Sequence, residues 1–251
     1  MTTRACHRYH RDVRSRRSWV LALFTLAVSA CAHGATSSAP TTSLPPTEVH
    51  AQVVTTVGAT AAAGSTGVPG LTADDPLCAA WAAFVGTVQA LGIAASFGGL
   101  SSEQFAALEL QAAPRLGEVA AAIDASLPPE LASEHAVVVD QRIGPYARRA
   151  KRALDVLTAA GVTTDEISTL TSAWQSALLQ RDPVAPVLAV PPAAAELQAK
   201  VDAAAATYDK DVTPFAQDPS LVVDGITTPL TDAYLVAHCP DLVSSGVGDA
   251  L

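Results

Sequence analysis

The chain has 251 residues, of which 49% are hydrophobic and 5% aromatic, and its 24 acidic residues outnumber its 15 basic ones. This length allows one domain of ordinary size with extensions, or at most two small domains. The acidic balance and the lack of a basic block argue against a protein that binds a nucleic-acid backbone.

Residues 1–30 have the layout of a secretory signal peptide. Six arginines and a single acid, Asp12, precede an uncharged apolar run of 12 residues from Trp19 to Ala30. Twelve helical residues extend about 18 Å, which is well short of the roughly 30 Å hydrocarbon core of a bilayer. We therefore expect export and removal of this segment rather than a permanent membrane span.

The end of the apolar run, Val28-Ser29-Ala30-Cys31, resembles the lipobox of bacterial lipoproteins. The resemblance implies cleavage before Cys31, whose thiol takes up a diacylglycerol group and whose new amino terminus is often acylated, for example with palmitate. It predicts a protein anchored by lipid on the extracytoplasmic face of the cell membrane. An acidic chain gains no electrostatic attraction to anionic lipid, so the acyl chains must hold it there.

Two further resemblances concern export and origin. The stretch Ser15-Arg16-Arg17-Ser18-Trp19-Val20 resembles a twin-arginine export signal, although a leader with six arginines can contain such a pair by chance. The leader, linker and helical domain together resemble lipoproteins of high-GC actinobacteria.

Residues 31–72 contain the predicted lipidated cysteine and a flexible linker. Between positions 32 and 72, 30 of 41 residues are Ala, Thr, Ser, Pro or Gly, and Glu48 is the only Asp, Glu, Lys or Arg. Such a composition has too few large apolar groups to offset the entropy lost on ordering. A short strand in residues 49–57 is the alternative to a mobile tether.

Residues 73–251 form the predicted domain, in which apolar residues recur every three or four positions, as on one face of a helix. Asp74 or Asp75 can cap a first helix that ends at Gly98-Gly99. Ser101 and Gln104 have the spacing of a capping box. Pro114 then separates two apolar stripes, which continue to Leu127.

The second half of the domain continues the helical pattern. Residues 130–160 are expected to form one long segment, kinked at Gly144-Pro145 because proline lacks a backbone donor. Thr163 and Glu166 form a second capping box. A proline-rich loop over residues 183–192 leads to two last helices. The fold class predicted is therefore all-α, a single bundle of six or seven helices.

The cysteines predict one disulfide. Cys6 leaves with the leader and Cys31 carries lipid, so only Cys78 and Cys239 remain. An exported protein with two remaining cysteines most simply pairs them. The bridge would join the first helix to the end of the last one. Two separate buried thiols are the alternative.

No catalytic residue, metal site or cofactor is predicted. The sequence has no G-x-S-x-G, H-E-x-x-H, P-loop or dinucleotide-binding motif. In the domain, His135 and His238 have no partner at a spacing that suggests catalysis. Asp202, Asp209 and Asp211 are interpreted as a solvated acidic face, because their spacing does not fit a calcium loop.

Two groups of side chains leave alternatives open. The large aromatic residues are either core anchors or the lining of a cleft for a lipid, tetrapyrrole or other apolar guest. They are Trp81, Trp174, Tyr208, Phe215 and Tyr234. Arg148, Arg149 and Arg152 lie three and four apart, opposite the apolar stripe, and should face solvent together. They form either a solvated face or a docking patch for an anionic envelope polymer, lipid headgroups or an acidic protein surface.

Three functions remain in competition. The first is a non-enzymatic binding or scaffold module of the cell envelope, and the second is a carrier of an apolar ligand. The third is an enzyme without a recognisable motif. The solute-binding subunit of a transporter is disfavoured, because such proteins resemble two-lobed α/β folds.

Overall fold

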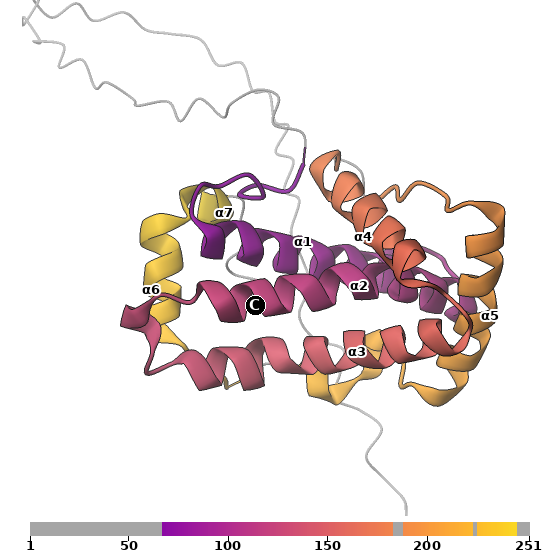
Figure 1. The fold of residues 1–251 in the computed structure, drawn as a ribbon. Helices are drawn as coiled ribbons and strands as arrows, with labels where there is room; N and C mark the ends of the chain where they lie inside the picture. The colour runs from indigo at the N-terminus through magenta and orange to yellow at the C-terminus, as the bar shows by residue number, and fades with distance from the viewer. Residues whose placement is uncertain (1–66, 183–187, 223–224, 245–251) are drawn as a thin grey trace, which may run out of the picture. The chain divides into compact units, whose positions relative to one another are not determined.

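The domain is a single bundle of α-helices, as the sequence predicts (Figure 1). The computed structural model describes residues 67–182, 188–222 and 225–244, which contain seven α-helices and no strand. The predicted signal peptide, Cys31 and most of the predicted linker lie outside the described residues. The helices are α1 (Pro76–Phe97), α2 (Ser102–Ser126), α3 (Gly144–Ala159), α4 (Thr164–Leu179), α5 (Ala195–Asp211), α6 (Pro229–His238) and α7 (Pro240–Ser244).

Helix α2 is the central element, because it packs against α1, α3, α4 and α5. In Figure 1 it runs between α1 and α3, with α4 and α5 toward one end and α6 and α7 at the other. Four short helical segments lie between the main helices. They are η1 (Pro129–Leu131), the π-helical η2 (Val137–Ile143), η3 (Phe215–Gln217) and η4 (Pro219–Leu221).

Capping side chains determine where three of the helices begin. The carboxylate of Asp75 accepts hydrogen bonds from the backbone N–H groups of Leu77, at 2.8 Å, and Cys78, at 3.1 Å. Both predicted capping boxes are present, at Ser101 and at Thr163. Each satisfies backbone donors that the first helical turn leaves without partners.

Prolines act differently from the sequence expectation at two places. Helix α2 continues through Pro114, so the two predicted stripes belong to one helix. The expected long segment over residues 130–160 is divided into η1, the π-helical η2 and α3. The change of helix type directly precedes Pro145, whose missing N–H removes a regular hydrogen bond. The predicted kink is thus a π-helical insertion.

The core contains three of the five predicted aromatic anchors. Trp81, Trp174 and Tyr208 are each at most 2% exposed, whereas Phe215 and Tyr234 are only partly buried. Helix α1 is the one described helix long and apolar enough to cross a membrane. Most of its surface is buried inside the bundle, as is typical of a core helix.

The chain is already part of the fold at Val68, five residues before the predicted start of the domain. Val68 is 5% exposed and belongs to the apolar cluster that contains Leu91, Trp174 and Leu178. Its backbone N–H donates to the carbonyl of Leu178 at 3.0 Å. A methyl group on Gly86 would lie 2.8 Å from Val68 Cγ2, so the absence of a side chain there makes room for Val68.

We predict that Gly86→Ala lowers stability although alanine favours helices. The new methyl must displace Val68, and overpacking of this kind costs about 1–3 kcal/mol. Gly92→Ala, on the same helix, is the matched control, because nothing lies within 4 Å of its added carbon. It should stabilise by about 0.5–1 kcal/mol. Thermal unfolding of both variants checks this, and equal shifts would contradict the packing of Val68.

The predicted disulfide between Cys78 and Cys239 is present and buried. It joins the first turn of α1 to the C-terminal cap of α6, with the two Cα atoms 5.4 Å apart. Beside it, the Tyr234 hydroxyl donates to Asp75 Oδ2 at 2.7 Å. This hydrogen bond and burial raise the pKa of Tyr234 to about 12, so the hydroxyl stays protonated at neutral pH.

We predict that Cys78→Ser with Cys239→Ser destabilises the domain by up to about 5 kcal/mol, because the bridge closes a loop of 161 residues in the unfolded chain. Chemical unfolding of oxidised, reduced and doubly substituted protein measures the effect. If both cysteines of the native protein react with an alkylating agent, the bridge is absent in the cell.

Candidate functional site

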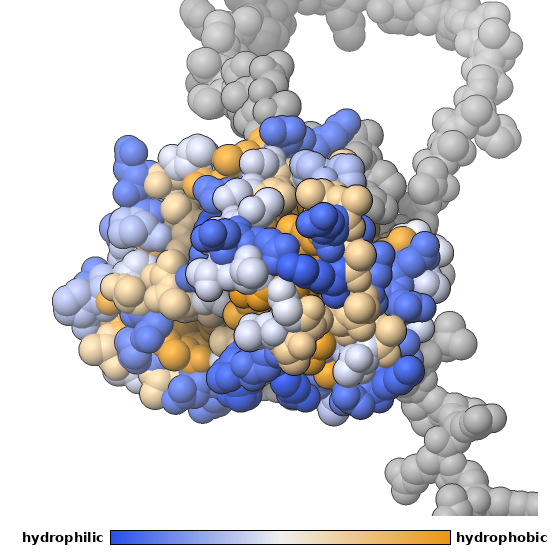
Figure 2. Space-filling view, turned by 45° about the vertical axis from the view of Figure 1, so that its right-hand side comes forward, coloured by the Kyte–Doolittle hydropathy of each residue, from blue (hydrophilic) through white to orange (hydrophobic). Residues whose placement is uncertain are grey.

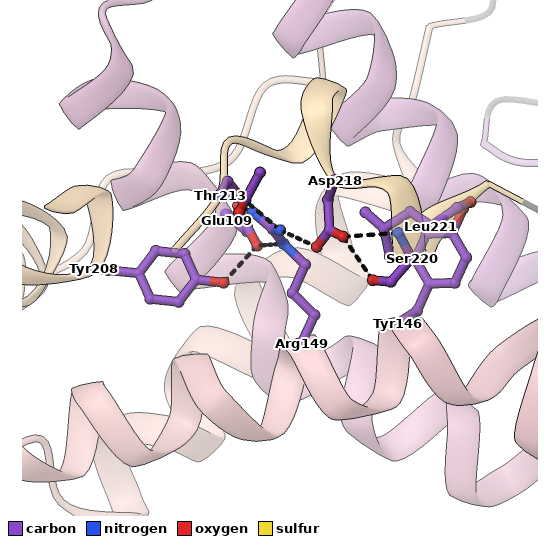
Figure 3. Close-up of polar contacts among 8 residues, drawn as sticks. All are labelled: Glu109, Tyr146, Arg149, Tyr208, Thr213, Asp218, Ser220 and Leu221. Carbon is purple, nitrogen blue, oxygen red and sulfur yellow. Dashed lines mark hydrogen bonds and ion pairs between the residues drawn. The ribbon is translucent and has the colours of Figure 1, made fainter. Parts of the chain in front are cut away.

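A buried cluster of charged and polar groups joins three helices and a loop (Figure 3). Glu109 lies in the N-terminal half of α2 and is 4% exposed, and Arg149 of α3 is 3% exposed. The Arg149 guanidinium donates through Nε to Glu109 Oε1 and through Nη2 to Glu109 Oε2, the second at 2.9 Å. The Tyr208 hydroxyl of α5 donates to Oε1 at 2.6 Å. The carboxylate of Glu109 is therefore fully engaged.

Arg149 also attaches the loop that follows α5. Its Nη1 donates to the carbonyl of Thr213 at 2.9 Å and to Asp218 Oδ2 at 2.7 Å. Burial opposes the charged form of Arg149, but its hydrogen bonds and proximity to Glu109 outweigh this and raise its pKa. Burial and the charge of Glu109 likewise raise the pKa of Tyr208. The groups thus use their donors and acceptors on one another, and the cluster serves as a structural clamp.

This cluster corrects the predicted docking patch of Arg148, Arg149 and Arg152. Arg148 and Arg152 are exposed, but Arg149 points into the core and belongs to the clamp. The face of α3 that is buried includes Arg149 because Glu109 supplies the opposite charge that makes its burial possible. The three arginines therefore do not form one surface patch.

A second buried polar group fixes the start of α6. Glu134 accepts hydrogen bonds from the backbone N–H groups of Leu230, at 2.9 Å, and Thr231, at 2.8 Å. Burial opposes its charge, yet these backbone bonds hold the pKa of Glu134 below its usual value. Arg142 lies over the Trp81 ring and forms an ion pair with Asp232 at 2.7 Å. These contacts also serve the packing of α6.

The surface beside α2 contains two hollows that both border Gln111; together they are here called the α2 groove, and each is called one half of it. The neutral half has a volume of about 550 Å³ and lies between α2, α4 and the extended segment 188–194. None of its lining residues carries a charge. They are Gln111, Ser168, Thr169, Leu170, Ser172, Ala173, Ser176, Val190, Pro191, Pro192, Ala193 and Ala194.

The acidic half has a volume of about 780 Å³ and lies between α2 and α5. It is lined by Leu100, Ser101, Glu103, Gln104, Ala107, Leu108, Gln111, Gln198, Asp202 and Ala205. Gln111 borders both halves, and its amide donates to Gln198 Oε1 at 3.3 Å. In Figure 2, where the α5 side of Figure 1 comes forward, hydrophobic residues are exposed between hydrophilic ones.

The histidines and acidic residues considered in the sequence do not come together. His135 pairs with Asp124 at 2.9 Å, and His238 stacks on Tyr234 beside the disulfide. Asp202 lines the α2 groove, while Asp209 accepts a hydrogen bond from Ser102 at 3.0 Å. Within the described ranges, no three His, Cys, Asp or Glu side chains are grouped so that they could hold a metal ion.

Comparisons with known proteins provide no relative for this arrangement. No family model, curated protein or solved structure matches the chain. The helices, the clamp and the α2 groove must therefore support any functional conclusion.

The burial of Glu109 and the presence of the groove were not predicted from the sequence, for different reasons. Glu109 is a lone charge in the apolar stretch Phe105–Ala113, interrupted otherwise only by Gln111, and that isolation is a signal for a buried ion pair. The groove depends on how α4, α5 and segment 188–194 approach α2. A hydrophobic period along one helix carries no information about such distances.

We predict that Arg149→Met costs about 3–5 kcal/mol of stability, because it leaves the Glu109 carboxylate buried without its cation. Arg148→Met, one residue away and exposed, is the matched control and should change stability by less than about 0.5 kcal/mol. Adding Glu109→Leu to Arg149→Met should recover much of the loss, since the most deeply buried carboxylate is then removed and only the more exposed Asp218 is left without its cation. Denaturant unfolding of the four proteins measures these differences. Equal effects at Arg148 and Arg149 would contradict the clamp.

Proposed function

We propose that this protein is an exported, lipid-anchored component of the cell envelope. Its helical domain binds a partner and catalyses no reaction. The Val28–Cys31 lipobox and the linker composition support the anchor. The α2 groove supports the binding role, because it is an open concave surface with polar groups and small apolar residues on rigid helices. The single observation that carries this proposal is the groove.

The packing of the core favours this role over a carrier of an apolar guest. The rings of Trp81, Trp174 and Tyr208, which could have lined an interior cleft, are buried among neighbouring side chains. The Trp174 indole N–H even donates to the Thr87 hydroxyl, at 3.2 Å. Native mass spectrometry of protein taken from its own membrane distinguishes the two functions. A stoichiometric lipid or tetrapyrrole beyond the covalent anchor would favour the carrier.

The anchor is tested by Cys31→Ser. Without the thiol no diacylglycerol can be attached, so the protein should leave the detergent-extracted membrane fraction or accumulate with its leader uncleaved. Cys78→Ser, which breaks the disulfide but leaves Cys31 in place, is the control and should remain membrane-bound. If the Cys31→Ser protein loses its leader and still stays in the membrane, the lipobox interpretation is wrong.

The binding role is tested by photocrosslinking in the cell. Benzoylphenylalanine replaces Ala107 in the acidic half or Ala173 in the neutral half of the α2 groove. Ala125, exposed near the C-terminal end of α2, is the control position. We expect a discrete crosslinked product from the groove positions and none from Ala125. Products that are absent, or that are the same at all three positions, would contradict a binding role for the groove.

A further inference from the structure

The acidic half of the α2 groove combines an apolar floor with two carboxylates on opposite walls. Ala107 and Leu108 of α2, both partly exposed, supply apolar surface. Glu103 lies at the start of α2, and Asp202 lies on α5 across the groove. No lysine or arginine is among the residues that line either half. The walls are therefore negative, and nothing within the lining neutralises them.

The carboxylates of this half have no cationic partner among the described residues. Glu103 forms no ion pair there, and Asp202 accepts only a side-chain amide hydrogen bond from Gln198, at 2.8 Å. Several basic side chains of the domain are instead paired with other acids. These pairs are Arg115–Glu118, Arg142–Asp232, Arg149–Glu109, Lys151–Asp155 and Lys200–Glu166.

We propose that the acidic half of the α2 groove binds a polypeptide segment that carries lysine or arginine between small apolar residues. A long basic side chain lays its methylene stem on apolar surface while its charged end reaches outward. Here the stem would cover Ala107 and Leu108, and the cation would meet Glu103 or Asp202. Such a side chain complements both the apolar floor and the negatively charged walls of the groove.

The residues that line the neutral half favour a polypeptide over a small polyamine as the ligand. The neutral half, which shares Gln111 with the acidic half, is lined mostly by small apolar side chains together with serine and threonine hydroxyls, and it has no carboxylate. An extended peptide backbone can exchange hydrogen bonds with Gln111, Gln198 and the serine hydroxyls of α4. A polyamine carries further ammonium groups along its length, and none of them would meet a carboxylate in this half.

This inference rests on the proposed binding role and adds the chemistry of the ligand. It is tested with the full lipidated protein in neutral detergent and a fluorescent peptide of alternating lysine and alanine. Titration should show binding that weakens as NaCl is added, because the charges are exposed to solvent. The double variant Glu103→Gln with Asp202→Asn should bind about tenfold more weakly, as expected for two exposed charge pairs.

The control variant Glu130→Gln with Asp140→Asn removes the same charge from the segment over η1 and η2 and should bind like the unmodified protein. Equal weakening by both double variants would show attraction to net charge alone and overturn the inference. Equal binding of an alternating glutamate–alanine peptide, or competition by spermidine as effective as that by unlabelled peptide, would do the same. Crosslinks at Ala107 that persist in the Glu103→Gln and Asp202→Asn protein would reject the basic ligand but retain the binding role.

Discussion

The carboxylate of Glu109, buried in the N-terminal half of the central helix, is the constraint on which much of this bundle depends. A charge in that position must be compensated within the protein, because removing it from water is costly. Arg149 brings α3 to it, and Tyr208 brings α5. Arg149 then reaches Thr213 and Asp218, so the loop after α5 is placed by the same requirement. One buried charge thus organises two helices and a loop around α2.

The clamp and the groove share helices. The α2 groove lies along α2 and α5, whose separation is set in part by the contact between Glu109 and Tyr208. Its other wall, α4, is placed by Trp174, which is buried against α1 and donates to Thr87. The surface with the features of a binding site is therefore framed by rigid core contacts, and its shape follows from the packing beneath it.

Local rules account for what the sequence predicted well. Capping residues such as Ser101 and Thr163 act within one helical turn, so their hydrogen bonds can be inferred from spacing alone. The pairing of Cys78 with Cys239 was predicted from the expectation of export and from the small number of cysteines. Arg149 was misplaced because a charged residue beside an apolar stripe is normally exposed. Its burial depends on Glu109, 40 residues away in the chain, which helical periodicity cannot reveal.

The disulfide also bears on how the domain withstands proteases. The extended segment 188–194 is largely exposed and lies between α4 and α5, inside the covalent ring that Cys78 and Cys239 close. A single cut there leaves two fragments that remain joined by the bridge. The clamp spans the same cut, because Glu109 and Arg149 precede it and Tyr208 follows it. A nicked molecule therefore stays one covalent unit with its central contacts intact, and separates into fragments only when the bridge is reduced.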